Sequence, residues 1–280
     1  MAESVKITTL SENSAIGRCI GEWGLSILVE TDECKVLFDT GRSFTAVLNA
    51  QTLGIDLADI DRLVLSHGHF DHTGGLKDVL YVCGNVEVIA HPDIFASKYK
   101  CLPNNEPEYI GIPYERGELE SMGATFSLAK QPVEVSKGVT TTGEIPQVTD
   151  FESIDTMLCV QDGDSYPKDE LADDQALIIK TDAGLVVVLG CSHRGVINTL
   201  LHAQKITGID RINAIIGGLH LMRASAEYSS RVVDELMKFD IKMIAASHCT
   251  GFAASCRLHQ TFGDRFILNN AGTTLILPAI

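Results

Sequence analysis

The stretch Ser66-His67-Gly68-His69-Phe70-Asp71-His72 decides the fold. It follows an apolar run, Asp61–Leu65, which predicts a strand, and it precedes Thr73-Gly74-Gly75, which opens a predicted helix. Side chains two residues apart on an extended chain project to the same side, so His67 and His69 should face one pocket. Asp71 and His72 lie where the chain turns and should approach from another side. Imidazole and carboxylate groups are ligands for zinc, and also for iron or manganese, so the stretch predicts a metal site.

Four other apolar runs end in the same way, with polar side chains and small residues. These strand ends are Asp39-Thr40-Gly41, Gly190-Cys191-Ser192-His193, Gly217-Gly218-Leu219-His220 and Ser247-His248-Cys249-Thr250. A single histidine in such a place is ordinarily structural. Sites in open α/β architectures collect at the carboxyl ends of strands, so together these residues predict one shared pocket.

Strand-like and helix-like segments alternate through the rest of the chain. In the first half, strands are expected at Val5–Leu10, Ser26–Glu30, Lys35–Phe38 and Asn85–Ala90, and helices at Phe44–Leu53 and Gly75–Tyr81. In the second half, strands are expected at Ala176–Thr181, Leu185–Leu189, Ile212–Ile216, Lys242–Ala246, Phe266–Leu268 and Thr274–Leu277, with helices at Val196–Lys205, Ala226–Lys238 and Phe252–Phe262. This pattern predicts an α/β fold in which two packed sheets carry helices on the outside, a single domain of four layers over residues 1–280.

Residues 101–122 interrupt this pattern with five glycines or prolines and two asparagines from Pro103 to Gly117, followed by a short polar stretch. We expect a long loop, an insertion or lid over the site, and a plain surface insertion is the alternative.

The composition restricts the partners and the compartment. A net charge of −15 argues against a nucleic-acid partner, because such binding depends on Lys and Arg at phosphates. A bound metal adds local positive charge, so a small anionic substrate is compatible with the sequence. No signal peptide or apolar run long enough for a membrane span is recognised, and the eight cysteines are scattered. We expect a cytoplasmic protein with reduced thiols, no membrane partner, and a homodimer as one option for assembly.

Three glycine-rich turns stand beside the candidate ligands: Gly41-Arg42-Ser43, Thr73-Gly74-Gly75 and Ser192–Gly195. Free N–H groups at helix starts bind anions well, and Arg42 and Arg194 are close in sequence. A phosphate or carboxylate of the substrate is therefore expected at these turns, with ordinary capping by Thr73 and Ser192 as the alternative.

These motifs resemble the metallo-β-lactamase superfamily. The HxHxDH signature is present as His67, His69, Asp71 and His72, and the upstream Asp-Thr-Gly as Asp39-Thr40-Gly41. Further segments resemble one branch, labelled 7,8-dihydropterin-6-methyl-4-(β-D-ribofuranosyl)aminobenzene 5′-phosphate synthase: Thr141–Pro146, Asp173–Leu177 and the strand ends that carry Cys191, His220 and His248. The resemblance implies the αββα sandwich and a centre with one or two metal ions, expected to be Zn²⁺, with Mn²⁺ or Fe²⁺ as alternatives.

The chain departs from the superfamily pattern in two places. Residues 130–176 contain no histidine, and the strand end at Cys191 lacks the usual metal-bridging aspartate. From the resemblance we infer that His193 completes a first site with His67 and His69, and that Asp71, His72 and His248 form a second. Cys191 is either a bridging thiolate or a buried thiol.

The resemblance implies a metal-dependent hydrolase that attacks a small, phosphorylated or otherwise anionic substrate through metal-bound hydroxide. Asp71 would orient the nucleophile, His220 would be a general acid or substrate contact, and Asp39 would hold a ligand imidazole in its tautomer. Arg42, Arg194 and Thr250 are assigned to substrate binding. One alternative is the transferase of the branch label, which joins an aminobenzoate-type acceptor to a phosphoribosyl donor. Another is a metal-containing binding or sensor protein.

Overall fold

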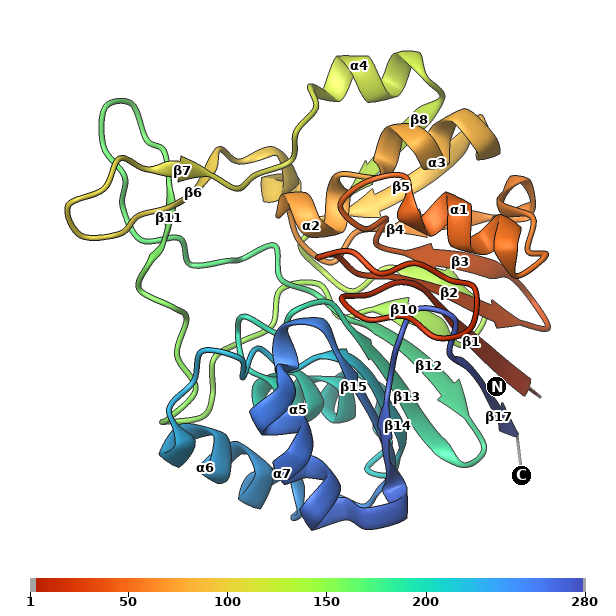
Figure 1. Cartoon of the computed structure of the whole chain (residues 1–280), viewed down its shortest axis with the longest axis vertical. Coiled ribbons are helices and arrows are strands. Elements are labelled where there is room, and N and C mark those ends of the chain that lie inside the picture. The colour runs from red at the N-terminus through yellow and green to blue at the C-terminus, as the bar shows by residue number, and fades with distance from the viewer. Residues whose placement is uncertain (1–3, 279–280) are drawn as a thin grey trace.

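The computed structural model describes residues 4–278, and two seven-stranded sheets face each other at its centre. Helices cover the outer face of each sheet, so the chain forms an αββα sandwich, as the sequence predicts (Figure 1).

The first sheet is built mainly from the N-terminal half of the chain. Its order is β17 (Thr274–Pro278), β1 (Ser4–Ser11), β2 (Ser26–Thr31), β3 (Lys35–Phe38), β4 (Arg62–Val64), β5 (Val86–Ala90) and β8 (Ala124–Leu128). The helices of this half are α1 (Thr45–Thr52), α2 (Phe70–Thr73), α3 (Leu76–Cys83) and α4 (Arg116–Ser121). The last strand of the chain therefore completes the first sheet, beside its first strand.

The second sheet comes from the C-terminal half. Its order is β16 (Phe266–Leu268), β15 (Ile241–Ser247), β14 (Ile212–Gly218), β13 (Gly184–Leu189), β12 (Leu177–Thr181), β10 (Val139–Thr141) and β9 (Glu134–Ser136), and its helices are α5 (Val196–Thr207), α6 (Ala226–Leu236) and α7 (Phe252–Phe262). Short 3₁₀ turns lie at Leu57–Asp59, Pro92–Phe95, His248–Thr250 and Gly263–Arg265.

Alternation of side chains along each strand explains the four layers. On β13, Val186 and Val188 pack against the first sheet, whereas Leu185, Val187 and Leu189 pack under the helices. Both faces of this strand are apolar because both are buried, and its parallel pairing with β14 is typical of such strands. Burial of these aliphatic side chains is the main favourable term in folding, at about 25 cal/mol per Å² of apolar surface.

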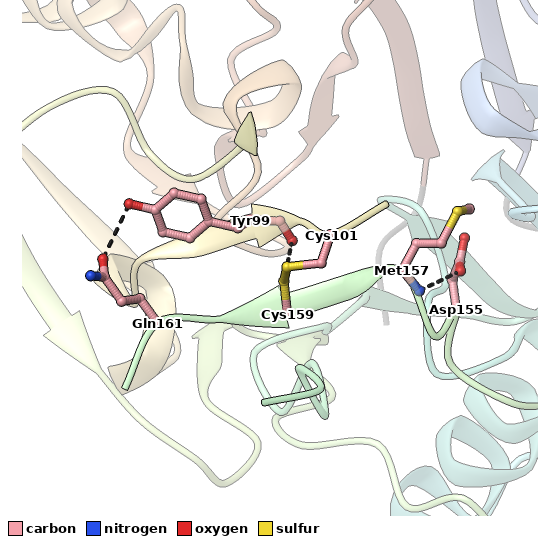
Figure 2. Close-up of a disulfide and its surroundings, with 6 residues drawn as sticks. All are labelled: Tyr99, Cys101, Asp155, Met157, Cys159 and Gln161. Atoms are coloured by element: carbon pink, nitrogen blue, oxygen red, sulfur yellow. Dashed lines mark hydrogen bonds between the residues drawn. A yellow bond between two sulfur atoms is a disulfide. The ribbon is translucent and has the colours of Figure 1, made fainter. Parts of the chain in front are cut away.

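A third, three-stranded sheet stands to one side of the sandwich, in the order β11 (Leu158–Val160), β6 (Lys98–Lys100) and β7 (Glu108–Tyr109) (Figure 1). A disulfide between Cys101 and Cys159 joins the end of β6 to β11 (Figure 2). The expectation that all thiols are reduced is wrong for this pair. Sequence spacing gives no sign of it, because pairing of the two strands brings together cysteines 58 residues apart.

Residues 101–122 do not form one continuous loop. Glu108–Tyr109 is a strand of the side sheet, and Arg116–Ser121 is a helix whose Leu119 packs in the core under the first helix layer. The helices and long strands expected from periodicity are present, while the strands between residues 124 and 160 are additional. None of the helices in the described part of the chain is long and apolar enough to cross a membrane.

Candidate metal centre

The candidate ligands lie where strands of both main sheets end, and the backbone there adopts a rare conformation. Asp39 after β3, Ser192 after β13, His220 after β14 and His248 after β15 all have positive φ, between 53° and 59°. Non-glycine residues seldom adopt this left-handed conformation, and such residues concentrate at functional sites. The turns direct side chains from separate strands toward one place.

Three imidazoles form the first group. His67 Nε2 lies 3.0 Å from His69 Nδ1 and 3.2 Å from His193 Nε2. All three residues are at most 6% exposed. Their ligand atoms lie within 4.8 Å of one another, so they could hold one metal ion.

Asp71, His72 and His248 form the second group with the same mutual spacing of ligand atoms. His248 Nε2 lies 3.3 Å from Asp71 Oδ2, and the rings of His72 and His248 are 5.0 Å apart at their centroids. The structure thus brings together the six residues predicted as ligands, in the two groups that the sequence analysis assigns. Their role as ligands stays a prediction.

Cys191 stands between the two groups. Its Sγ lies 3.2 Å from His72 Nε2, and it shares ligand spacing with His67 and His72 on one side and with His248 and Cys249 on another. The thiol thus occupies a place from which it can reach both groups. Thiolate sulfur is a good ligand for zinc and a poor one for magnesium or manganese, so this donor set fits zinc.

Asp39 orients two of the imidazoles. His72 Nδ1 donates to Asp39 Oδ2 at 2.7 Å, which leaves Nε2 as the ligand atom. Ser66 Oγ donates to the same oxygen at 2.7 Å and lies 2.9 Å from His67 Nδ1, so Asp39 also fixes His67 through Ser66. Carboxylates that fix ligand imidazoles in this way raise the affinity of metal sites.

The charges of the centre favour a bound cation. Burial lowers the pKa of His69 to about 3, and burial together with neighbouring imidazoles keeps the pKa values of His67 and His193 well below the usual range. Burial also lowers the pKa of His72, but Asp39 outweighs this and raises it to about 9. Ring nitrogens packed this closely, with most rings neutral, present lone pairs to a common point, which suits a divalent metal.

Two residues missed by the sequence analysis complete the surroundings of His248. Its Nδ1 lies 3.1 Å from Asn13 Oδ1, and its ring lies 4.9 Å from the ring of Trp23. Both belong to the loop between β1 and β2, whose sequence shows no periodicity and no motif.

A buried ion cluster supports the His67 and His69 backbone. Lys98 Nζ lies 2.7 Å from Asp169 Oδ2 and 2.9 Å from Asp173 Oδ1, and Asp173 Oδ2 accepts the Gly68 N–H. Lys98 belongs to the side sheet, so that sheet is connected to the centre through this lysine.

A cleft opens over the centre. Its walls include His69, Asp71, His193, His220 and His248 beside the apolar side chains Trp23, Phe70, Ile110, Leu158 and Met222. Ile110 follows β7 and Leu158 lies on β11, so the side sheet forms one wall of the cleft. His220 packs against His193 with ring centroids 4.2 Å apart, and its role as general acid or substrate contact stays a prediction.

The structure does not place Arg42, Arg194 or Thr250 in the cleft wall. The Arg42 guanidinium lies over the Phe70 ring, outside the cleft. The Arg194 side chain donates to the carbonyls of Ile145 and Glu170. The Thr250 hydroxyl accepts the Leu219 N–H.

Two of the three turns expected to bind a substrate anion already hold carboxylates of the chain itself. Glu22 accepts the N–H groups of Arg42 and Ser43, and Glu152 accepts those of Ile197 and Asn198 at the start of α5. At these two turns the anion is a carboxylate of the chain, so the expectation of a substrate anion is corrected there, and for Thr73-Gly74-Gly75 it stays a prediction.

Comparison with known proteins identifies the family. Residues 24–150 match the family model of the metallo-β-lactamase superfamily. A 7,8-dihydropterin-6-methyl-4-(β-D-ribofuranosyl)-aminobenzene-5′-phosphate synthase of Methanocaldococcus jannaschii is 33% identical over 96% of each chain. The chain belongs to the metallo-β-lactamase superfamily. It resembles the synthase over nearly its whole length, as the branch motifs predict.

Solved structures of the metallo-β-lactamase superfamily agree with the fold. Tm1679, described as a metal-dependent hydrolase of this superfamily, superposes with a TM-score of 0.83 at 28% identity, over 97% of this chain and 98% of that one. A diphosphatase of the PhnP family, 15% identical over the full length of both chains with a TM-score of 0.57, shares the fold alone.

Proposed function

We propose that this protein is a zinc-dependent hydrolase that acts on a small molecule with an anionic group. The observation that carries the proposal is the open cleft over two groups of three ligand side chains, with Cys191 between them. Catalytic metal sites keep an open position, whereas structural sites close theirs with four protein ligands.

The chain's own residues have distinct tasks in this proposal. His67, His69 and His193 would hold one divalent ion and Asp71, His72 and His248 a second, and these ions would supply Lewis-acid chemistry in the cleft. Asp71 accepts a hydrogen bond from the attacking water and so orients it. His220 faces the cleft beside His193 and can protonate the leaving group. Asp39 keeps His72 and His67 in the tautomers that bind metal.

The test begins with the zinc-loaded protein and a panel of phosphomonoesters, phosphodiesters, lactones and β-lactams. We expect hydrolysis of at least one substrate class, and we expect His69→Ala to lower the rate of hydrolysis by a factor of about 100 or more. His202→Ala is the matched control, because His202 lies on α5 away from the cleft. Full activity in His69→Ala would exclude the assignment.

A second candidate is the transfer reaction of the synthase relative. The 33% identity to the synthase over nearly the whole chain favours this reaction. The cleft also continues into a second hollow, lined by Glu152, Gly195 and Tyr228 among others, which gives room for a second substrate. The reaction would join an aminobenzoate-type acceptor to the ribosyl carbon of phosphoribosyl pyrophosphate, with release of pyrophosphate and carbon dioxide. Pyrophosphate release that requires both substrates would favour transfer, while release without the acceptor would favour hydrolysis.

Quantitative metal analysis addresses the remaining alternative, a binding or sensor protein. We expect close to two zinc ions per chain together with turnover. Bound metal without turnover on any substrate of either reaction would favour a sensor.

A further inference from the structure

The cleft over the metal centre continues into a second hollow. The two hollows share Asp155, His193, His220 and Arg223 in their walls. Beyond these residues the second hollow runs past Gly195 at the start of α5 to Tyr228 and Val232 of α6. A substrate whose reacting group lies beside His193 can therefore extend past His220 and Arg223 into the second hollow.

Arg223 is the one lysine or arginine among the described residues that line either hollow. Its side chain is exposed, and no hydrogen-bond or ion-pair partner of its guanidinium is found within residues 4–278. Of the other basic residues near the centre, Arg42 lies over the Phe70 ring outside the cleft, and Lys98 and Arg194 are already paired. Lys98 binds Asp169 and Asp173, and Arg194 binds backbone carbonyls.

The acidic groups of the second hollow have partners of their own. The Glu152 carboxylate accepts two N–H groups at the start of α5, where the helix dipole compensates its charge. Asp155 Oδ1 accepts the Met157 N–H at 2.9 Å (Figure 2). Arg223 is thus left without a carboxylate partner.

Two further polar side chains, Tyr228 and His220, line the second hollow beside the arginine. Burial raises the pKa of Tyr228 to about 12, so its phenol stays protonated and able to donate at neutral pH. The Nδ1 atom of His220 is buried and lacks a hydrogen-bond partner among the described residues. A buried polar atom without a partner is costly, and a polar ligand group in the hollow would supply one.

We propose that the second hollow binds a phosphate group of the substrate, with Arg223 as its charge partner and Tyr228 and His220 as additional contacts. This inference rests on the proposed function, because the hollow adjoins the metal centre. The planar guanidinium matches the oxygens of a phosphate in a bidentate manner. The subsite would select substrates that carry a phosphate at a distance from the reacting bond.

Calorimetric titration of the zinc-loaded full chain with inorganic phosphate tests the subsite. We expect Arg223→Gln to weaken phosphate binding about tenfold and Arg223→Glu to weaken it further. Arg18→Gln is the matched control, because Arg18 is exposed in the loop after β1 and lines neither hollow. Wild-type affinity in both Arg223 variants would overturn the proposal and leave the metal ions as the sole phosphate site.

Zinc content separates this proposal from the proposed function. We expect the Arg223 variants to bind as much zinc as the wild-type chain, since Arg223 belongs to neither group of ligands. A chain that turns over no substrate, yet binds phosphate in an Arg223-dependent manner, would contradict the hydrolase and support the subsite. Turnover together with phosphate binding that does not depend on Arg223 would support the hydrolase and contradict the subsite.

Discussion

At the scale of single residues, Asp39 determines the ring orientation and tautomer of two histidines, His72 and His67. Its carboxylate receives His72 directly and His67 through Ser66, and it also accepts the Ser66 N–H at 2.7 Å. One buried side chain therefore orients a member of each ligand group.

Asp39→Asn should lower zinc affinity by about 10- to 100-fold, the usual effect of removing a carboxylate that orients a ligand imidazole. Asparagine tolerates the left-handed backbone at this position, so the turn should be preserved. Competition with a chromophoric chelator measures the affinity. Asp59→Asn, an exposed residue near Lys35, is the control, and unchanged affinity in Asp39→Asn would contradict the role.

Cys191→Ala should reduce the bound zinc from about two ions to about one, because the thiol reaches both groups. In the cobalt-substituted wild-type protein we expect a sulfur-to-metal charge-transfer band, absent from the variant. Cys34→Ala, a buried thiol distant from the centre, should leave band and stoichiometry unchanged. If Cys191→Ala keeps both the charge-transfer band and the zinc stoichiometry of the wild type, Cys191 is a buried thiol only.

Asp174 provides a prediction about pH. Burial raises the pKa of its carboxyl to about 7, and Oδ2 accepts the Arg194 N–H. The folded state binds this proton more tightly than the unfolded chain, so the contribution of Asp174 to stability is complete below pH 4 and is lost as pH rises through 7. Asp174→Asn should therefore lose less stability than the wild type between pH 5 and pH 8, by about 1–3 kcal/mol. Denaturant unfolding at several pH values measures this difference, and parallel profiles would contradict it.

At the scale of elements, the side sheet (β11, β6 and β7) has little hydrophobic core of its own. Its strands are two or three residues long, and its buried cluster is small, consisting of Ile154, Leu158 and Leu171 with Ile110 packed against them. The side sheet is held in addition by the Cys101–Cys159 disulfide and by the ion pairs of the buried Lys98 with Asp169 and Asp173.

Replacing both Cys101 and Cys159 by serine should lower the free energy of unfolding by about 2–4 kcal/mol, since a crosslink over 58 residues restricts the unfolded chain. We also expect faster proteolysis of the 102–107 segment, because β6 and β11 then depend on their short ladder alone. Limited proteolysis with and without a dithiol reductant provides the measurement. Equal cleavage rates in both forms would show that the disulfide does not hold this sheet in place.

The sequence predicted the long strands and helices because their apolar periodicity is set by burial in four layers. It could not predict β9, β10 or β11, which are three residues long and form only through pairing with neighbours. It predicted which histidines meet, because strand ends converge. Arg194 belongs to a glycine-rich turn that predicts an anion site, yet its side chain donates to the carbonyls of Ile145 and Glu170. The sequence does not single out Arg223, because a lone arginine after Leu221 and Met222 belongs to no motif.

At the scale of the whole molecule, the candidate metal centre lies between the two main sheets. His67, His69, Asp71 and His72 follow β4 of the first sheet, while His193 and His248 follow β13 and β15 of the second. Each candidate ligand group contains residues that follow strands of both sheets, so an ion bound there would connect the two sheets in addition to its role in catalysis.

Removal of metal by a chelator should therefore lower the melting temperature of the whole chain, because a ligand that binds only the folded state stabilises it by mass action. We expect a fall of several degrees, reversed by zinc. A variant that lacks both His193 and His248 should melt at the same temperature with and without the chelator. A wild-type melting temperature insensitive to the chelator would contradict this linkage.

The pairing of β1 with β17 has a consequence for synthesis on the ribosome. Val5 of β1 lies opposite Leu277 of β17, so the first sheet is complete only once residue 277 has left the exit tunnel. His248 also emerges late, so neither the outer edge of the first sheet nor the second ligand group can form early in translation. Zinc should therefore be captured only after residue 248 has left the exit tunnel, and a nascent chain arrested before residue 248 should bind the ion far more weakly than the released protein.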